Sequence, residues 1–489
     1  MDTTFFNNLW ETLQFDPFEP LLFNSGFFLF FFLFVLIFHR VFSTNRRAKI
    51  IFLLLTSLFF YYKSSGIYFL LIIISSLIDF YAGKWIQLSD DGAKRKFLLV
   101  LSIITNLGIL AYFKYTNFLI NTINNLSSSS FDFIDIFLPV GISFFTFQSM
   151  SYTIDIYRRN LKPEENFTDF LFFVSFFPQL VAGPIVRASD FLPQIRQEVI
   201  LTREDIGRAV VLIIAGLFKK AVIADYISIN FIDRIYDWPT RFTGVENLMA
   251  IYSYSLQIYC DFSGYSDMAI GLALLMGFRL PDNFNSPYKA TTITDFWRRW
   301  HISLSSWLRD YLYIGLGGNR KGKIRTYFNL FATFVLCGLW HGAAWKFVIF
   351  GSIHGLAITI EKYFNLPKKM ESNWFLKIIG GIVTFHLFAF SLLFFRPQSN
   401  QLAFEMLDQI FNFFKAPVFM QFVEGYPIIV VMVVVGYLLH FVPKKLELKW
   451  EAFVTKLPLV GKAILLCAVI WLVVQFKSAD IQPFIYFQF

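Results

Sequence analysis

The residue of this chain whose setting most suggests chemistry is a histidine inside an apolar stretch. His341 lies in the segment VLCGLWHGAAWKF (335–347), between apolar runs that cover 327–340 and 347–360. Burying a polar ring without a partner costs about 1–3 kcal/mol, and an ionisable group inside a membrane segment is by default a candidate for function. From the residues alone, a catalytic histidine and a hydrogen-bonded structural histidine are equally supported.

Two glycines and a second histidine accompany this residue. Gly338 and Gly342 flank the pair formed by Trp340 and His341, and glycine lets a backbone bend or lets a ligand approach closely. We therefore expect the glycines to leave room for a substrate. His354 follows 13 residues after His341, which is about 220° around a continuous helix. The two imidazoles share a face only if the chain bends between them.

A third histidine lies in the segment DFWRRWHISLSSWLRDYL (295–312). Helical spacing places Trp297, His301 and Leu304 on one stripe, with polar side chains on the opposite face. The spacing predicts one amphipathic helix at a membrane surface, with His301 on its buried side. A hydrogen-bonded packing histidine is the alternative.

Two acids lie within the apolar segment 246–276. The motif YCDFSGYSDMAIG (259–271) contains Asp261, Ser263 and Asp267. Carboxylates in such a segment need partners or water. The wall of a polar pocket and a structural hydrogen-bond network would each supply them, and the residues do not favour either one.

Other patterns that could hold a phosphate or a metal are incomplete. The segment GGNRKGK (317–323) has the spacing of a phosphate-binding loop, but residue 324 is isoleucine, where Mg²⁺ binding needs Ser or Thr. It predicts a turn. Cys260, Cys337 and Cys467 are too few and too far apart for a metal framework. We expect no metal and no permanently bound cofactor.

Membrane helices must position these residues. The chain has 489 residues, of which 56% are hydrophobic, 20% aromatic and 16% charged, and its mean hydropathy is +0.55. A soluble domain carries about 25% charged residues, so the composition predicts an all-α polytopic membrane protein. The net charge of +9 comes from Lys and Arg spread over many loops, which is typical of membrane topology and argues against nucleic-acid binding.

The distribution of charge also predicts an orientation. Basic loops alternate with an acidic connection, which places both termini outside and the basic loops in the cytoplasm. The first twenty residues contain four acids and no Lys or Arg, unlike a cleaved signal peptide. Prolines and a glycine interrupt 167–200, so we expect a re-entrant segment there. Lys219 and Lys220 inside an apolar helix predict partial insertion or snorkelling.

Taken together, the motifs resemble those of the membrane-bound O-acyltransferases, and within that family the bacterial alginate O-acetyltransferase branch. The resemblance rests on PVGISFFTFQSMSYTIDIYR (139–158), FFPQLVAGPI (176–185), YCDFSGYSDMAIG, FNSPY (284–288), DFWRRWHISLSSWLRDYLYIGLGGNR (295–320) and GLWHGAAWKFVIFGSIHG (338–355). It implies a helical ring with a central tunnel, built from about 11–13 membrane or half-membrane helices. We expect N-terminal transmembrane helices in 1–135, a catalytic core with re-entrant segments in 136–365, and C-terminal transmembrane helices with an extracytoplasmic aromatic tail in 366–489.

The resemblance also implies roles for particular residues. The histidine of the family's WHG motif is catalytic, which implies His341 as the general base. The family's second position, usually His, Asn or Asp, falls on His301, which would orient the donor or polarise its carbonyl. The expected donor substrate is acetyl-CoA, whose phosphates would meet the basic residues of 279–325. Further candidates for lining the tunnel or binding the donor are Trp340, Trp300, Arg298, Arg299, Asp261, Ser263, Asp267 and His354.

The end of the chain carries one more resemblance. PFIYFQF is similar to an F-x-Y-x-x-F motif of bacterial members or their small partner proteins. That similarity implies Tyr486 as an acyl relay, and an aromatic anchor at the lipid–water interface is the alternative. The expected partners are an extracytoplasmic SGNH or esterase-like acetyltransferase, a polysaccharide acceptor and membrane lipid. The expected location is the cytoplasmic (inner) membrane of a bacterium.

Two other functions fit the same residues. One is a related enzyme that moves D-alanine from a carrier protein to teichoic acid. The other belongs to a different class, a transporter or flippase in which Asp261, Asp267 and His341 form an ion path.

Overall fold

The computed structural model describes residues 10–17, 20–197, 200–476 and 484. Over these residues the chain is helical, with turns and extended connections but no β-strand. The all-α class expected from the sequence is therefore confirmed. The backbone falls into two compact units: unit 1 contains 1–209 and 269–281, and unit 2 contains 210–268 and 282–489. The three-part division at 135 and 365 stays a prediction.

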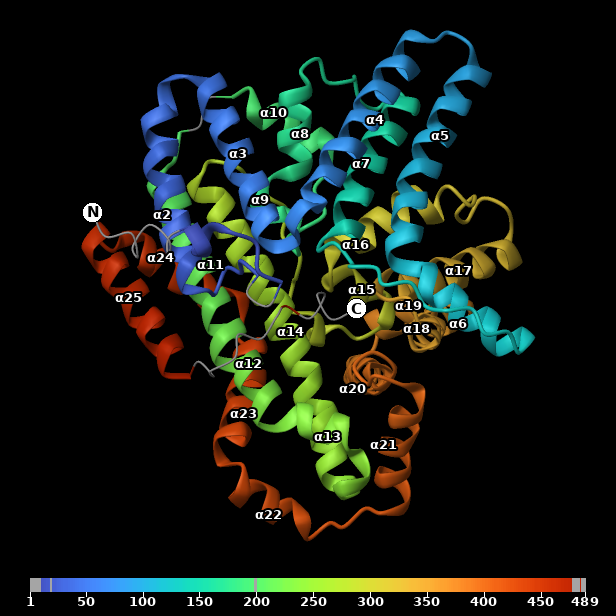
Figure 1. The fold of residues 1–489 in the computed structure, drawn as a ribbon. Helices are drawn as coiled ribbons and strands as arrows, with labels where there is room; N and C mark the ends of the chain where they lie inside the picture. The colour runs from blue at the N-terminus through green and yellow to red at the C-terminus, as the bar shows by residue number, and fades with distance from the viewer. Residues whose placement is uncertain (1–9, 18–19, 198–199, 477–483, 485–489) are drawn as a thin grey trace. The chain divides into compact units, whose positions relative to one another are not determined.

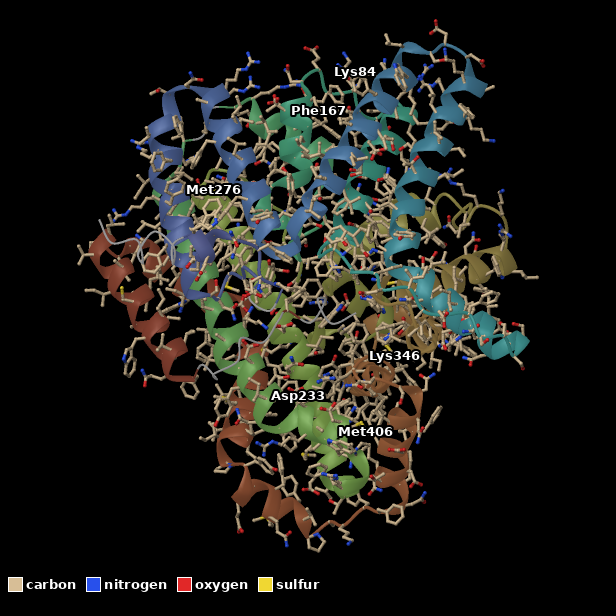
Figure 2. All side chains as sticks on the ribbon, in the orientation of Figure 1. Lys84, Phe167, Asp233, Met276, Lys346 and Met406 are labelled. Atoms are coloured by element: carbon tan, nitrogen blue, oxygen red, sulfur yellow. The ribbon has the colours of Figure 1, made fainter. Side chains whose placement is uncertain are left out.

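Unit 1 is a bundle of apolar helices (Figure 1). Helices α4 and α5 lie side by side, and both pack on α7, while α3 packs on α8. At one end of the unit, the ammonium of Lys84 lies 4.3 Å from the ring centre of Phe80, which in turn contacts Phe167 (Figure 2). The α-helices are α2 (Gly26–Val41), α3 (Arg46–Ser65), α4 (Phe69–Leu88), α5 (Gly92–Leu110), α6 (Thr116–Ser127), α7 (Ile142–Tyr157), α8 (Phe167–Ser175), α9 (Phe177–Leu180), α10 (Ala188–Ile195) and the first part of α11 (Arg203–Leu217).

The helix pattern in 167–200 is interrupted, as the prolines and glycine predicted. Helix α8 ends at Ser175, the single turn of α9 contains Pro178, and α10 begins only at Ala188. Proline lacks a backbone donor and cannot continue the preceding ladder. The aromatic rings of this segment are fully buried within unit 1, where Phe176 and Phe191 both pack on Phe278. A bent backbone at this place is therefore surrounded by protein.

Unit 2 holds the remaining helices; it begins with the second part of α11, which π-helical turns follow. The elements after α11 are η4 (Phe218–Ala224), α12 (Asp225–Ile227), η5 (Ser228–Ile232), α13 (Asp233–Asp237), η6 (Pro239–Arg241), most of α14 (Gly244–Leu275), η7 (Pro287–Lys289), α15 (Ile293–Arg299), α16 (Ile302–Trp307), η8 (Leu308–Tyr313), α17 (Lys323–His341), α18 (Trp345–Tyr363), α19 (Leu366–Glu371), α20 (Trp374–Ser391), η9 (Leu392–Phe394), α21 (Asn400–Asn412), α22 (Val418–Gly425), α23 (Pro427–His440), α24 (Lys444–Lys456) and α25 (Leu459–Phe476). The segment 317–323 is a turn, with positive φ at Gly317, Gly318 and Gly322. That expectation is confirmed.

The two lysines of η4 pair with carboxylates instead of snorkelling, and partial insertion of this helix stays a prediction. Lys219 donates to Asp267 at 2.6 Å, and Lys220 contacts Asp225 at 2.7 Å and Asp261 at 2.5 Å. Both acids on α14 face η4 because Gly264 lets the two backbones approach: a Cβ there would lie 2.8 Å from the carbonyl oxygen of Gly216. Neighbouring carboxylates therefore compensate the charges of the two ammonium groups, in place of contact with water.

Several described helices are long and apolar enough to cross a membrane. By length and composition there are five of them, or six if the pair Val418–Gly425 and Pro427–His440, bent by 92°, forms one span. The five are Gly26–Thr44, Arg46–Leu88, Gly92–Ser127, Trp374–Phe394 and Leu459–Phe476. This agrees with the multi-pass membrane protein predicted from the composition.

Candidate active site

His341 is the last residue of α17, where the chain turns back into α18. Gly342, the next residue, is extended with φ −164°, and α18 then runs beside α17 (Figure 1). The imidazole is 2% exposed. A helix end within unit 2 therefore presents His341 to the protein interior, as the sequence predicted for a buried ring.

The glycines around His341 do not leave room for a substrate, and that expectation was wrong. A Cβ at Gly338 would overlap the carbonyl oxygen of Phe347, and a Cβ at Gly342 would overlap the Phe347 ring. Gly351 on α18 meets the backbone of α17 in the same way. Small residues allow two helix backbones to approach closely, so the space that they leave is filled by the neighbouring helix.

The ring of His341 is enclosed by aromatic side chains. Its centroid lies 5.2 Å from that of Trp340, 5.3 Å from Phe395 and 6.0 Å from Phe350. The thiol of Cys337, one turn earlier on α17, lies 3.9 Å from Nε2. Such an enclosure excludes water from the imidazole.

Two cations anchor the segment that brings Phe395 to this site. Lys346 donates to the carbonyl oxygens of Phe395 (3.3 Å) and Pro397 (2.6 Å), and Arg396 donates to Asp233 at 2.6 Å. Lys346 and Asp233 are labelled in Figure 2. These contacts hold the chain on both sides of the Phe395 ring, and hence hold that ring against His341.

His301 lies at a break between two helices, not within one. Helix α15 ends at Arg299, α16 begins at Ile302, and His301 between them has φ +43°. The single amphipathic helix expected over 295–312 is therefore wrong, although the imidazole is fully buried as predicted. The backbone of 283–285 fills the break: Ile302 N–H donates to the Asn283 carbonyl, and Asn285 N–H donates to that of Arg299, both at 2.9 Å.

The two histidines meet around one tryptophan. The ring centroid of Trp340 lies 5.9 Å from that of His301 and 5.2 Å from that of His341. His301 also packs on Phe262 of α14 at 4.6 Å, and its Nδ1 lies 3.2 Å from Oδ1 of Asn283. All of these residues belong to unit 2. Residues 40 positions apart in the sequence thus converge on one buried site.

His354 lies behind this site with both ring nitrogens engaged. Nδ1 accepts a hydrogen bond from the Trp297 indole N–H at 3.2 Å, and Nε2 lies 3.0 Å from the Ser391 hydroxyl. The ring of Phe350 contacts both imidazoles, 4.7 Å from that of His354 and 6.0 Å from that of His341. With both nitrogens used within the protein, His354 has none left for a substrate.

The other candidates lie at different depths. Trp300 is buried and packs on Phe388 at 5.0 Å. Arg298 is exposed, whereas Arg299 is partly exposed and pairs with Asp295 at 2.9 Å.

Asp261 and Asp267 of α14 form ion pairs with lysines. Asp261 and Asp267 pair with Lys220 and Lys219, and Ser263 between them is fully buried. Within the part of the chain that the structure describes, no group of three or more His, Cys, Asp or Glu could hold a metal ion. The acids of this helix thus form a structural charge network.

The C-terminal tail contributes one described residue. Phe484 is 1% exposed, and its ring lies 4.9 Å from that of Tyr265 and 5.5 Å from that of Phe262. Phe262 is the ring that packs on His301. Tyr486 lies outside the described residues, so its role stays a prediction.

Sequence reasoning missed several residues of this site. Phe262 and Phe395 read as ordinary apolar positions among 65 phenylalanines, so no local signal separated them. Asn283 lies one residue before the FNSPY motif (284–288) in a polar connection. A buried amide in a connection is uncommon, but only tertiary structure shows that this one is buried.

Comparisons with known proteins place these residues in a wider context. The profile of MBOAT, the membrane-bound O-acyltransferase family, matches residues 160–396. A peptidoglycan O-acetyltransferase of Helicobacter pylori is 38% identical over 359 residues, which are 68% of this chain and 68% of that protein. The "Probable alginate O-acetylase AlgI" of Pseudomonas aeruginosa is 42% identical over 319 residues, which are 64% of this chain and 60% of that protein.

A third relative carries a different activity. The teichoic acid D-alanyltransferase of Bacillus subtilis is 31% identical over 271 residues, which are 52% of this chain and 68% of that protein. The chain thus spans between three fifths and about two thirds of the length of these three relatives. Two kinds of acyl group occur among proteins that share its central sequence.

Proposed function

We propose a specific reaction for this chain, which belongs to the membrane-bound O-acyltransferase (MBOAT) family and is an O-acyltransferase related to polysaccharide O-acetylases. The reaction is transfer of an acetyl group from a cytoplasmic thioester, acetyl-CoA, for O-acetylation of a secreted or cell-wall polysaccharide. The observation that carries the proposal is the burial of His301 and His341 around Trp340. Two imidazoles in one water-poor site suit proton transfer at a thioester.

His341 acts as the general base. It takes the proton of the acceptor hydroxyl as that oxygen attacks the thioester carbonyl carbon. The C–S bond then breaks, and the departing thiolate receives a proton from the His341 imidazolium, so His341 is neutral again at the end of the cycle. The rings of Phe350 and Phe395 around it limit hydrolysis of the thioester.

The donor is held from the basic side of the chain. Arg298, which is exposed, provides a guanidinium for the donor's phosphates. The positive charge of the segment 279–325 also supports a cytoplasmic location for that segment, with both termini on the outer face of a bacterial inner membrane.

The acetyl group leaves through the tail. Phe484 is buried and packs on Phe262, whose ring in turn packs on His301. Two residues of extended chain reach at most about 7 Å. We infer Tyr486, two residues after Phe484 in the sequence, as the hydroxyl acceptor and relay. An extracytoplasmic SGNH or esterase-like acetyltransferase would then take the acetyl group from Tyr486 and pass it to the polysaccharide.

The reaction is tested with purified protein in lipid nanodiscs and acetyl-CoA labelled in the acetyl group. His341→Ala should lower transfer by about 10²–10⁴-fold, the usual contribution of a general base, while thermal unfolding stays cooperative. His386→Ala, which changes an exposed histidine of unit 2, is the matched control and should transfer normally. Near-normal transfer by a folded His341→Ala variant would overturn the proposal.

D-alanyl transfer is the second candidate, favoured by the likeness to the teichoic acid D-alanyltransferase. The same preparation should be supplied with a labelled D-alanyl carrier protein in parallel with labelled acetyl-CoA. Label accepted from the carrier and not from acetyl-CoA would establish the second function in place of the first.

A further inference from the structure

The amide of Asn283 lies in hydrogen-bonding contact with the His301 ring and with Ser303 at the start of α16. Its Oδ1 lies 3.2 Å from the backbone N of Ser303, 2.9 Å from the Ser303 hydroxyl and 3.2 Å from Nδ1 of His301. Its Nδ2 donates to the hydroxyl of Ser266 at 3.2 Å. Asn283 is 1% exposed, so these contacts form within the protein interior.

The contact with Ser303 fixes which way the amide points. A backbone N–H can only donate, so the side-chain atom facing it must be the acceptor oxygen and not the NH₂ group. The same oxygen faces Nδ1 of His301. An oxygen without hydrogens cannot donate to a ring nitrogen, so Nδ1 must carry the proton. The Asn orientation thereby determines the tautomer of the histidine.

The environment of His301 also favours the uncharged ring. His301 lies outside the candidate membrane spans. Burial, followed by the charge of His341, places the pKa of His301 well below its ordinary value. A neutral imidazole protonated on Nδ1 has its lone pair on Nε2. In this state, Nε2 accepts a hydrogen bond and does not donate one.

We propose that Asn283 is a positioning residue that holds His301 as the Nδ1–H tautomer, so that His301 presents an acceptor nitrogen to the active site. The significance for catalysis rests on the proposed acyl transfer. In this tautomer His301 cannot polarise the thioester carbonyl, which needs a donor. Its Nε2 can instead accept a hydrogen bond from the attacking hydroxyl or from the N–H of His341, and so orient the group that reacts.

The tautomer can be measured without any acyl transfer. The chain has six histidines, all of which are labelled when the protein is made with ¹⁵N-histidine. The signals of His301 in solid-state NMR spectra are assigned as those that are missing in His301→Gln. The Nδ1–H form is expected in the wild-type protein. Asn283→Asp, which keeps an acceptor oxygen, should retain it, whereas Asn283→Ala should lose it. A wild-type signal from the Nε2–H form, or an unchanged signal in Asn283→Ala, would overturn the proposal.

Turnover then tests the consequence. Asn283→Ala should lower kcat by at least about tenfold, part of the effect of a positioned acid–base group, with the KM for the thioester changed by less than about twofold. Asn329→Ala removes another fully buried amide of unit 2, one that donates to backbone carbonyls of the turn at 316–318, and controls for loss of a buried asparagine. It should leave the His301 signal unchanged; a changed signal in this control would contradict a specific role of Asn283.

The two readouts separate failure of this proposal from failure of the proposed function. An Nδ1–H signal that depends on Asn283 in a protein with no acetyl transfer supports the positioning role and removes only the acyl-transfer proposal. Normal transfer with an Nε2–H signal does the reverse.

Discussion

The ring of Phe484 packs 5.5 Å from that of Phe262, so a residue near the C-terminus lies inside unit 2. Phe262 also contacts His301. Phe484 and the candidate active site are therefore linked through the Phe262 ring, and the position of Phe484 can be tested separately from the chemistry.

Phe484→Ala should release the tail. Replacing a buried phenylalanine by alanine costs about 3–5 kcal/mol, which is enough to move the tail from docked to free. Digestion by a carboxypeptidase, followed by mass spectrometry of the intact protein, should be faster for the variant than for the wild type, and acetyl transfer should fall by about tenfold or more. Trp471→Ala, at an exposed position of α25, is the control. Equal protection of both tails would contradict the docking.

His354→Ala should affect stability more than catalysis. The variant leaves the Trp297 indole N–H and the Ser391 hydroxyl without their shared partner, a loss of about 1–3 kcal/mol. Thermal unfolding should therefore shift downward, while kcat of the folded fraction falls by less than about tenfold. A loss of turnover as large as that of His341→Ala would instead show that His354 takes part in the reaction.

Gly338→Ala should separate α17 from α18. The added Cβ overlaps the backbone of α18, and overpacking of this kind costs about 1–3 kcal/mol. The melting temperature in detergent and the rate of transfer should both fall, because His341 lies one turn further along α17.

The matched control is Gly425→Ala, at the end of α22, where nothing lies within 4 Å of an added Cβ. It should be neutral or slightly stabilising, since alanine is the better helix former. The same melting temperature for both variants would mean that the close approach of α17 and α18 contributes little to stability.

Lys220→Met should destabilise unit 2 strongly. Lys220 and Asp261 are 3% and 1% exposed, and removing one partner of a buried ion pair costs about 3–5 kcal/mol. Lys377→Met, at an exposed position of α20, should have little effect. The double variant that combines Lys220→Met with Asp261→Asn should recover part of the loss. Thermal unfolding of the wild type, the two single variants and the double variant measures the coupling between Lys220 and Asp261. Failure of the second substitution to recover stability would exclude an uncompensated Asp261 charge as the cause.

The helical class and the burial of His301 and His341 could be predicted because they depend on composition and local apolar runs. The break at His301 could not, since helical spacing over 295–312 is regular on both sides of it. Its cause is the backbone of 283–285, which supplies hydrogen-bonding partners from a separate connection. Periodicity within one segment carries no information about such a partner.

The lysines of η4 illustrate the same difficulty with charge. Lys219 and Lys220 lie in an apolar run, and two of their three carboxylate partners, Asp267 and Asp261, lie more than 40 residues later. The sequence shows that each charge needs compensation, but water and a carboxylate are both acceptable. The close approach of Gly216 and Gly264 brings the carboxylates of α14 to these lysines, and this approach is not visible in the sequence.

The left-handed backbone at position 301 acts as a steric filter on amino-acid identity. With φ +43°, the position disfavours most side chains, whereas Asn, Asp and His are the residues other than glycine most enriched in this conformation. These three are also the residue types expected at the family's second position. The main-chain conformation alone thus favours, at position 301, short polar side chains with nitrogen or oxygen near the backbone. This preference is independent of any catalytic role of the side chain.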